Sequence, residues 1–141
     1  MAGLLHGESN WIANCANFCA LLFHGLPELN WAGFYYADET DLVLGPFQGQ
    51  PACIRIGYGK GVCGTAAATR QTQRVADVMA FPGHIACDSA SRSEIVLPLL
   101  IGGEFKGVLD LDSPVLNRFS AADQAGLEGL VTEFCAHHEV K

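Results

Sequence analysis

EIVLPLLIGGEFKGVLDLD, residues 94–112, is the stretch of the chain that says most about its architecture. Residues 94–101 are strongly apolar, and a short apolar run of this kind predicts a buried strand. The pair Gly102–Gly103 is typical of a tight hairpin turn. We therefore predict that residues 106–112 run back beside residues 94–101 as an antiparallel strand.

Further strand-like segments lie upstream of this hairpin. They are 31–36 (WAGFYY) and 42–47 (LVLGPF), which predict a second hairpin, and the shorter 52–56 and 74–76. Closely spaced glycines lead into a short helix that is predicted near residues 62–70. Residues 77–92 are predicted to be irregular.

Helical patterns bracket these strands. Apolar residues recur at helical spacing over residues 11–23, with Ser9 as the predicted N-cap and Gly25 as part of the stop signal. A last helix is predicted to start at Ser120, because Ser120 and Asp123 resemble a capping box. Terminal helices around a series of hairpins predict the α+β class with an antiparallel sheet.

Composition excludes several classes of protein. The chain has 141 residues, is half apolar and carries a net charge of −7, which argues against a disordered chain and against a nucleic-acid-binding surface. Residues 1–54 contain five acids and no Lys or Arg, so a secretory signal is not expected. No apolar run approaches the roughly 18 residues of a membrane span. We expect one soluble domain over residues 1–141, in the cytoplasm.

Six cysteines occur, without a C-x-x-C pair of the kind found in zinc ribbons and thioredoxins. Cys15, Cys19 and Cys135 lie on the apolar faces of the predicted terminal helices, where a thiol packs as a small hydrophobic group. These three are predicted to fill the core.

The other three cysteines are candidates for chemistry. Cys53 lies in a short apolar segment and is equally compatible with burial. Cys63 begins a glycine-rich helix, where the helix dipole is expected to lower the pKa of a thiol. Cys87 follows FPGHIA in the irregular stretch, and reactive groups are commonly displayed on such loops. Position alone makes Cys87 the strongest of the three.

Three carboxylates form a second candidate group. Asp110 and Asp112 are two apart on a predicted strand and therefore project from one face. Glu94 opens the partner strand and is expected near the same end of the pairing. The acids either mark a solvated strand end or border a pocket, in which burial and mutual repulsion would raise at least one pKa.

Two kinds of chemistry fit these residues. One is a metal site, which would use either Cys53, Cys63, His84 and Cys87 or the three carboxylates with a hard cation. The spacing of the cysteines argues against zinc, and we expect no metal or cofactor. The other combines a thiol nucleophile with protonated carboxyl groups. That combination suits the reduction of an oxidised sulfur or oxygen centre, with a second thiol to reset the first.

Six strings distributed over residues 30–134 carry a family resemblance. They are WAGFY (31–35), LGPFQG (44–49), GVCGT (61–65), GHIACD (83–88), SEIVLPL (93–99) and GVLDLDS (107–113). Together they strongly resemble the free methionine-(R)-sulfoxide reductases, small stand-alone enzymes with a GAF fold. The resemblance implies a central antiparallel sheet of about six strands, with N- and C-terminal helices packed on one face.

The resemblance also implies residue roles. Cys87 matches the nucleophile, and Cys53 matches the thiol that resolves its sulfenic acid as an intramolecular disulfide. Cys63 matches a third family cysteine of less defined role. The acids Glu94, Asp110 and Asp112 match the residues that bind substrate, and Glu94 or Asp112 would protonate the sulfoxide oxygen. Trp31 and Tyr35 match the pocket for the apolar end of the substrate, while the loop amides of Ile85 and Ala86 are suited to its carboxylate.

The function implied is thiol-dependent reduction of free L-methionine (R)-sulfoxide to L-methionine, with thioredoxin as the reductant. A homodimer is compatible with the resemblance. Family members usually begin with a longer helical segment than this sequence has. The alternative is a non-enzymatic GAF sensor of a small molecule, although three acids would repel a phosphate and the thiols would have no role.

Overall fold

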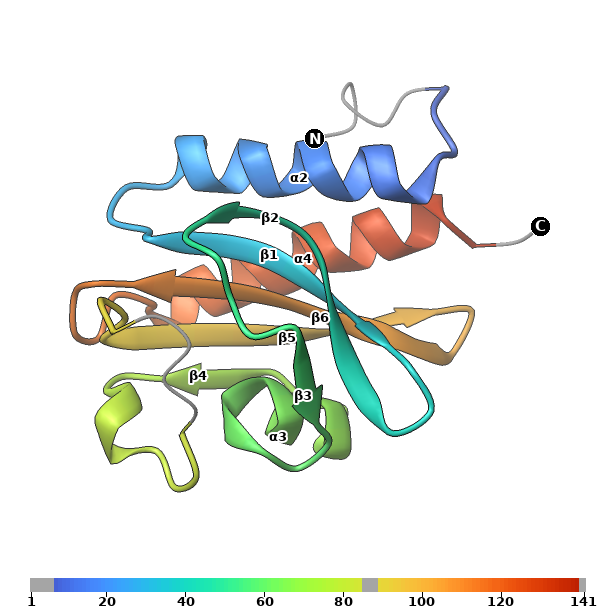
Figure 1. The fold of residues 1–141 in the computed structure, drawn as a ribbon. Coiled ribbons are helices and arrows are strands. Elements are labelled where there is room, and N and C mark those ends of the chain that lie inside the picture. Colours follow the sequence, from blue (N-terminus) through green and yellow to red (C-terminus); the bar gives the residue numbers. More distant parts are fainter. Residues whose placement is uncertain (1–6, 85–88, 140–141) are drawn as a thin grey trace.

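One antiparallel sheet of six strands organises the computed structural model, which describes residues 7–84 and 89–139. The strand order is β3-β2-β1-β6-β5-β4 (Figure 1). The strands are β1 (Trp31–Ala37), β2 (Asp41–Gly49), β3 (Arg55–Gly57), β4 (Gln73–Val75), β5 (Ser93–Ile101) and β6 (Glu104–Ser113). The predicted α+β class and the sheet of about six antiparallel strands are confirmed.

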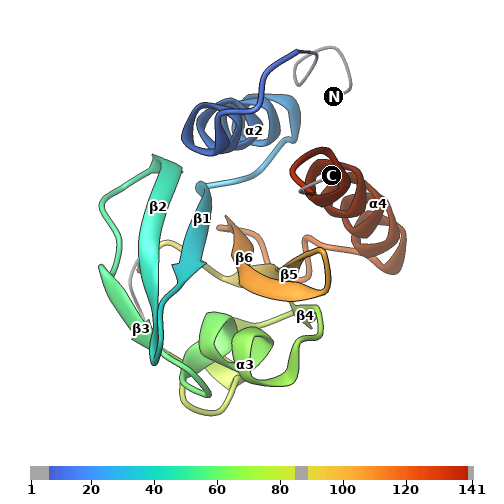
Figure 2. The same ribbon diagram turned by 90° about the vertical axis from the view of Figure 1, so that its right-hand side faces the viewer.

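Helices cover both faces of the sheet. Helices α2 (Trp11–Gly25) and α4 (Ala121–His137) pack on one face, and α3 (Gly61–Thr69) packs on the other (Figure 2). The core beneath α2 and α4 includes Phe18, Phe34 and Phe134, which are fully buried. The core beneath α3 is smaller and includes Val62, Val96 and Val108. The placement of the terminal helices on one face is confirmed.

Helix starts follow the capping rules, with one correction. The N-cap of α2 is Asn10, not Ser9, because the Asn10 side chain accepts the hydrogen bond from the Ala13 amide at 2.9 Å. The capping box of α4 forms as predicted. The Asp123 amide donates to Ser120 Oγ at 3.0 Å, and the Ser120 amide donates to Asp123 Oδ2 at 2.9 Å.

The short strand predicted over residues 52–56 is β3, Arg55–Gly57, and it starts later than expected. Pro51 has no amide hydrogen to offer a partner strand. The carbonyl of Cys53 accepts a hydrogen bond from the Tyr35 hydroxyl at 2.8 Å. Cys53 therefore lies in the connection before β3. The irregular stretch after β4 contains one turn of 3-10 helix, Val78–Ala80.

The β5–β6 hairpin contains a one-residue bulge. Ile101 pairs with Glu104 and Leu100 with Phe105, but Leu99 pairs with Gly107, so Lys106 is the extra residue. Gly107 has a φ of 149°, and a Cβ there would collide with the Tyr35 carbonyl oxygen on β1. Only glycine fits this position without a shift of the neighbouring strand.

None of the helices in the described ranges is long and apolar enough to cross a membrane.

Candidate active site

The bulge brings the three predicted acids together. An unbroken ladder from the turn would place Glu94 opposite Leu111, which faces the α2–α4 core. With the extra residue, Glu94 lies opposite Asp112, and Asp110 lies two residues further along the same face. All three are buried, with exposed fractions of 7%, 5% and 9% for Glu94, Asp110 and Asp112. Of the two interpretations of these acids, the structure therefore favours the pocket over the solvated strand end.

An aromatic wall stands beside the acids. Trp31 pairs with Asp112 across β1 and β6, so both side chains point to the same face. The Trp31 ring stacks on Phe47, with centroids 5.3 Å apart, and on Tyr35, at 5.9 Å. The Trp31 Nε1–H donates to the Gln50 carbonyl at 3.0 Å. The indole is thus held in one orientation by two rings and a hydrogen bond.

Gly33 leaves the space that the Trp31 ring occupies. A Cβ on Gly33 would lie 2.5 Å from Phe47 Cβ and 2.7 Å from Trp31 Cζ3. Both distances are far below an ordinary carbon contact. The position of the indole therefore depends on the missing side chain at residue 33.

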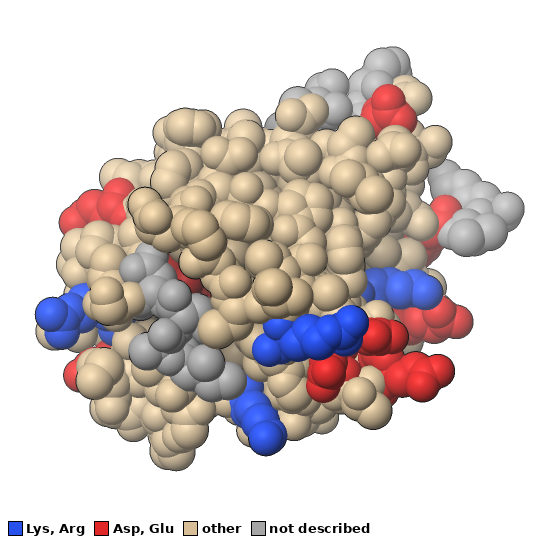
Figure 3. Space-filling model, in the orientation of Figure 1, with Lys and Arg blue, Asp and Glu red and all other residues tan. Residues whose placement is uncertain are grey.

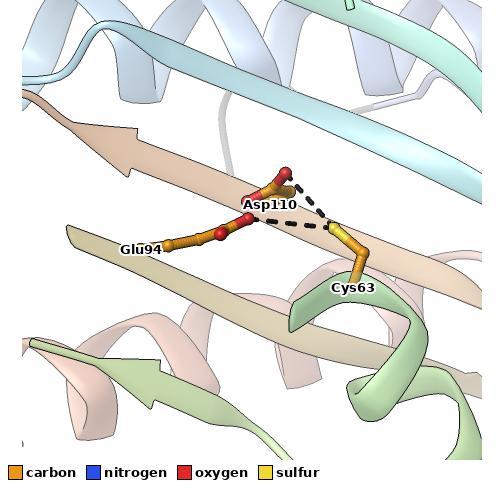
Figure 4. Close-up of side chains that lie close together, drawn as sticks. All are labelled: Cys63, Glu94 and Asp110. Carbon is orange, nitrogen blue, oxygen red and sulfur yellow. Dashed lines mark hydrogen bonds between the residues drawn. The ribbon is translucent and has the colours of Figure 1, made fainter. Parts of the chain in front are cut away.

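Cys63 reaches the acids from the other side, from the first turn of α3 (Figure 4). Its thiol donates to Asp110 Oδ2 at 3.3 Å and lies 3.9 Å from Glu94 Oε2. The thiol is 4% exposed. Cys63, Glu94 and Asp110 place possible ligand atoms within 4.8 Å of one another, so this is where the described residues could hold a metal ion.

Burial disfavours ionisation of the Glu94 and Asp110 carboxyl groups. Burial raises the pKa of Glu94 well above its usual range, and the negative charges of Asp110 and Asp112 add to the effect. Burial also raises the pKa of Asp110. Both shifts favour the protonated carboxyl group, which is the form that a general acid needs.

The expectation that the helix start lowers the pKa of Cys63 is wrong. Burial raises the pKa of this thiol well above its usual range, and the neighbouring Asp110 and Glu94 raise it further. The dipole of a nine-residue helix is too weak to offset the loss of water and two adjacent carboxyl groups.

A cavity unites most of the predicted site residues. Its lining includes Trp31, Tyr35, Cys63, Glu94, Asp110 and Asp112, together with His84. Acidic atoms are visible inside a hollow on the face shown in Figure 3. Ile85, Ala86 and Cys87 lie outside the described residues, so their predicted roles stay predictions.

The remaining cysteines separate by face. Cys15, Cys19 and Cys135 are free and buried in the α2–α4 core, as predicted. Burial raises the pKa of Cys15 to about 12 and that of Cys135 to about 11. Cys53 is half-buried against the core beneath α3 and is disulfide-bonded.

Sequence reasoning missed two polar residues of the cavity, Lys60 and Ser91. Lys60 is an exposed cation immediately before α3, and the salt bridges among the described residues do not include it. A signal was present in the sequence, because the glycine-rich run GYGKG contains a single Lys, three residues before Cys63. Ser91 accepts a hydrogen bond from the Asn30 side chain at 3.1 Å, and no pattern in the sequence marks it.

Comparison with known proteins places this site in a family. The model of the GAF domain family matches residues 17–134. The free methionine-R-sulfoxide reductase of Escherichia coli is 55% identical over 130 residues, covering 92% of this chain and 79% of the relative. The protein of the same name from Saccharomyces cerevisiae is 47% identical over 136 residues, covering 91% and 76%.

A solved structure agrees with these relatives. The free methionine-R-sulfoxide reductase from Neisseria meningitidis, in complex with its substrate, superposes with a TM-score of 0.92 at 45% identity, covering 96% of this chain and 82% of that one. The chain therefore belongs to the GAF domain family and, within it, to the free methionine-R-sulfoxide reductases, which are oxidoreductases.

Proposed function

We propose that this protein reduces free L-methionine (R)-sulfoxide to L-methionine. The observation that carries the proposal is a cavity whose buried carboxyl groups, Glu94, Asp110 and Asp112, lie beside the fixed indole of Trp31. A proton donor and an apolar wall in one small site suit a substrate with a polar S=O group and a methyl end. The names of the relatives point to the same substrate.

Each charged group of the free amino acid has a complementary group in the cavity. An ionised carboxylate of the acid cluster receives the substrate ammonium, and the face of Trp31 receives the S-methyl end. Lys60 at the cavity lining supplies a cation for the substrate carboxylate, in addition to the predicted amides of Ile85 and Ala86. A methionine inside a polypeptide has neither charge, so the same site would reject it.

The thiol chemistry proceeds in three balanced steps. The Cys87 thiolate attacks the sulfoxide sulfur while Glu94 or Asp112 protonates the oxygen, so sulfoxide and thiol give methionine and a sulfenic acid on Cys87. The Cys53 thiol then displaces the hydroxyl group as water and forms the Cys53–Cys87 disulfide. A dithiol of the thioredoxin type reduces this disulfide and becomes a disulfide itself. The disulfide-bonded state of Cys53 supports its assignment as the resolving thiol.

Cys63 has a different role in this scheme. Its raised pKa keeps it a thiol, which is a poor nucleophile but retains the proton that it donates to Asp110. We assign it to positioning Asp110. Serine retains a donor at this position, so Cys63→Ser is expected to keep most of the activity, while Cys63→Ala leaves Asp110 without that donor and is expected to lose more.

Thioredoxin-coupled NADPH consumption tests the proposal directly. We expect turnover with the free R-epimer, little with the free S-epimer and none with a peptide that contains the sulfoxide. Comparable rates on the free amino acid and the peptide would refute the role of the charged cavity. No turnover with either free epimer would favour the sensor alternative.

Lys60 is tested separately with a substrate that lacks the carboxylate. Lys60→Met should raise the KM for methionine sulfoxide about tenfold or more, with little change in kcat, because a charge-assisted contact is lost. The same variant should leave the KM for methionine sulfoxide amide unchanged. An equal effect on both substrates would remove Lys60 from carboxylate recognition. The thioredoxin dependence, the cytoplasmic location and the homodimer stay predictions.

A further inference from the structure

The Cys63 thiol and the carboxyl groups of Glu94 and Asp110 form a ligand set of mixed chemistry (Figure 4). Their ligand atoms all lie within 4.8 Å of one another, and they come from three different elements, α3, β5 and β6. This set differs from the zinc ligands considered from the sequence, which combined loop cysteines with His84. The thiolate is a soft ligand, and the carboxylates are hard ones.

The distances fit a tetrahedral cation. With a metal–sulfur distance of about 2.3 Å and a metal–oxygen distance of about 2.0 Å, the sulfur and oxygen of a tetrahedral site are separated by about 3.5 Å. The Cys63 sulfur lies 3.3 Å from Asp110 Oδ2 and 3.9 Å from Glu94 Oε2. Shifts of a few tenths of an ångström would therefore bring both sulfur–oxygen distances to this value.

Two further observations point to a cation at this place. Asp110 Oδ1, the carboxylate oxygen that does not accept from Cys63, is buried and has no hydrogen-bond partner among the described residues, so this ligand residue carries a buried acceptor without the compensation that it requires. All three residues also line the cavity, which gives an ion a route from solvent. Three carboxyl groups and one lysine line the cavity, so the carboxylates outnumber the positive charge once a cation displaces their protons.

We propose that Cys63, Glu94 and Asp110 form a binding site for a thiophilic divalent cation of the zinc class, which occupies the cavity in place of substrate. The cation bonds to the sulfur of Cys63 and to one oxygen of each carboxylate, with water in the fourth position. The thiol proton and the carboxyl protons pass to solvent. A purely oxygen-seeking cation such as Mg²⁺ is excluded by the thiolate and by the small number of ligands. The inference goes beyond the proposed function, because it concerns binding and not turnover.

Cobalt(II) is the spectroscopic probe for this site. The full chain is first oxidised so that Cys53 is disulfide-bonded, as in the structure. Titration with Co²⁺ should produce a saturable thiolate-to-cobalt absorption in the near ultraviolet at one equivalent per chain, together with the visible bands of tetrahedral cobalt. An equivalent of Zn²⁺ should abolish both, and Mg²⁺ in excess should not. Absence of the near-ultraviolet band would overturn the proposal.

Variants identify the ligands. Cys63→Ser should lose the near-ultraviolet band, whereas Cys135→Ser, which removes a thiol from the opposite face of the sheet, should keep it. Asp110→Asn should weaken Co²⁺ binding tenfold or more, and this variant decides the matter if circular dichroism shows that Cys63→Ser is not folded. A band that persists in folded Cys63→Ser, or unchanged affinity in Asp110→Asn, contradicts the site. Because no turnover is needed, failure here leaves the reductase assay unaffected.

Discussion

Replacement of Gly33 by alanine should damage both the stability of the protein and its cavity. The new Cβ would lie 2.5 Å from Phe47 Cβ and 2.7 Å from Trp31 Cζ3, whereas ordinary contacts begin near 3.4 Å. One of the two side chains must therefore move by nearly 1 Å. Neither can move freely, because the Trp31 ring stacks on Phe47 and its Nε1 is bonded to the Gln50 carbonyl.

The structure sets the size of the effect. Overpacking of a buried site costs about 1–3 kcal/mol of the free energy of unfolding. For a chain of this length that corresponds to a fall in Tm of about 3–12 °C. A displacement of the indole by nearly 1 Å would also disturb the wall that we propose for the apolar end of the substrate. We therefore expect kcat/KM for free methionine sulfoxide to fall about ten- to a hundred-fold.

Thermal unfolding and steady-state kinetics measure the two effects. Gly126→Ala on the exposed side of α4 is the matched control, because a Cβ there has no atom within 4 Å. Alanine in a helix interior should raise the free energy of unfolding by up to about 1 kcal/mol and leave activity unchanged. If Gly33→Ala has the Tm and KM of the unmodified protein, the argument that Gly33 fixes the indole is wrong.

The remaining predictions concern the acids and the thiols. Glu94→Gln should reduce turnover by about 100-fold or more, and Asp112→Asn comparably if the two share the proton; near-normal rates for both would exclude them from proton transfer. Cys87→Ser should release no methionine in a single turnover. Cys53→Ser should release about one equivalent of methionine and accumulate the sulfenic acid, which mass analysis detects. The reverse result would exchange the roles of the two cysteines. Because burial raises the pKa values of Glu94 and Asp110, the folded state binds more protons than the unfolded state above pH 4 or so. The contribution of these two carboxyl groups to stability is therefore present at low pH and lost as the pH rises through their pKa values in the folded state. The Tm of the unmodified protein should fall between pH 5 and 9, and it should fall less in Glu94→Gln. A constant Tm, or an equal fall in both proteins, would contradict this.

The sequence was sufficient for the architecture around the site. The apolar run of residues 94–101 and the Gly102–Gly103 turn predicted the β5–β6 hairpin, and period-two alternation placed Asp110 and Asp112 on one face. Both predictions depend only on residues within the hairpin, and the strands on either side of the hairpin pair with it without changing these features.

The position of Glu94 could not be predicted by the same counting. An ideal two-residue turn pairs Glu94 with Leu111 and sends its side chain into the α2–α4 core. The bulge at Lys106 corrects the register, and it depends on the close approach of Gly107 to the Tyr35 carbonyl on β1. This contact joins two strands that are about seventy residues apart in the sequence, so it cannot be predicted from the residues of either strand alone.

The environment of Cys63 escaped prediction for a similar reason. The glycine-rich helix start was visible, and it suggested an acidified thiol. The acids that reverse the effect come from β5 and β6, more than thirty residues away. Likewise, nothing local distinguished the cavity residue Lys60 from an ordinary solvated lysine.

The division of the thiols between the two faces of the sheet has a consequence for repeated oxidation. A disulfide requires Cβ atoms about 3.5–4.5 Å apart, and a layer of strands stands between the α2–α4 core and the site. Cys15, Cys19 and Cys135 therefore cannot exchange with a disulfide on the other face unless the chain unfolds. The sheet thus separates these three thiols from the redox cycle that we propose for the site. In the proposed cycle, the three thiols of the α2–α4 core would therefore take no part in disulfide exchange, which leaves Cys63 as the free thiol on the face of the site among the described residues.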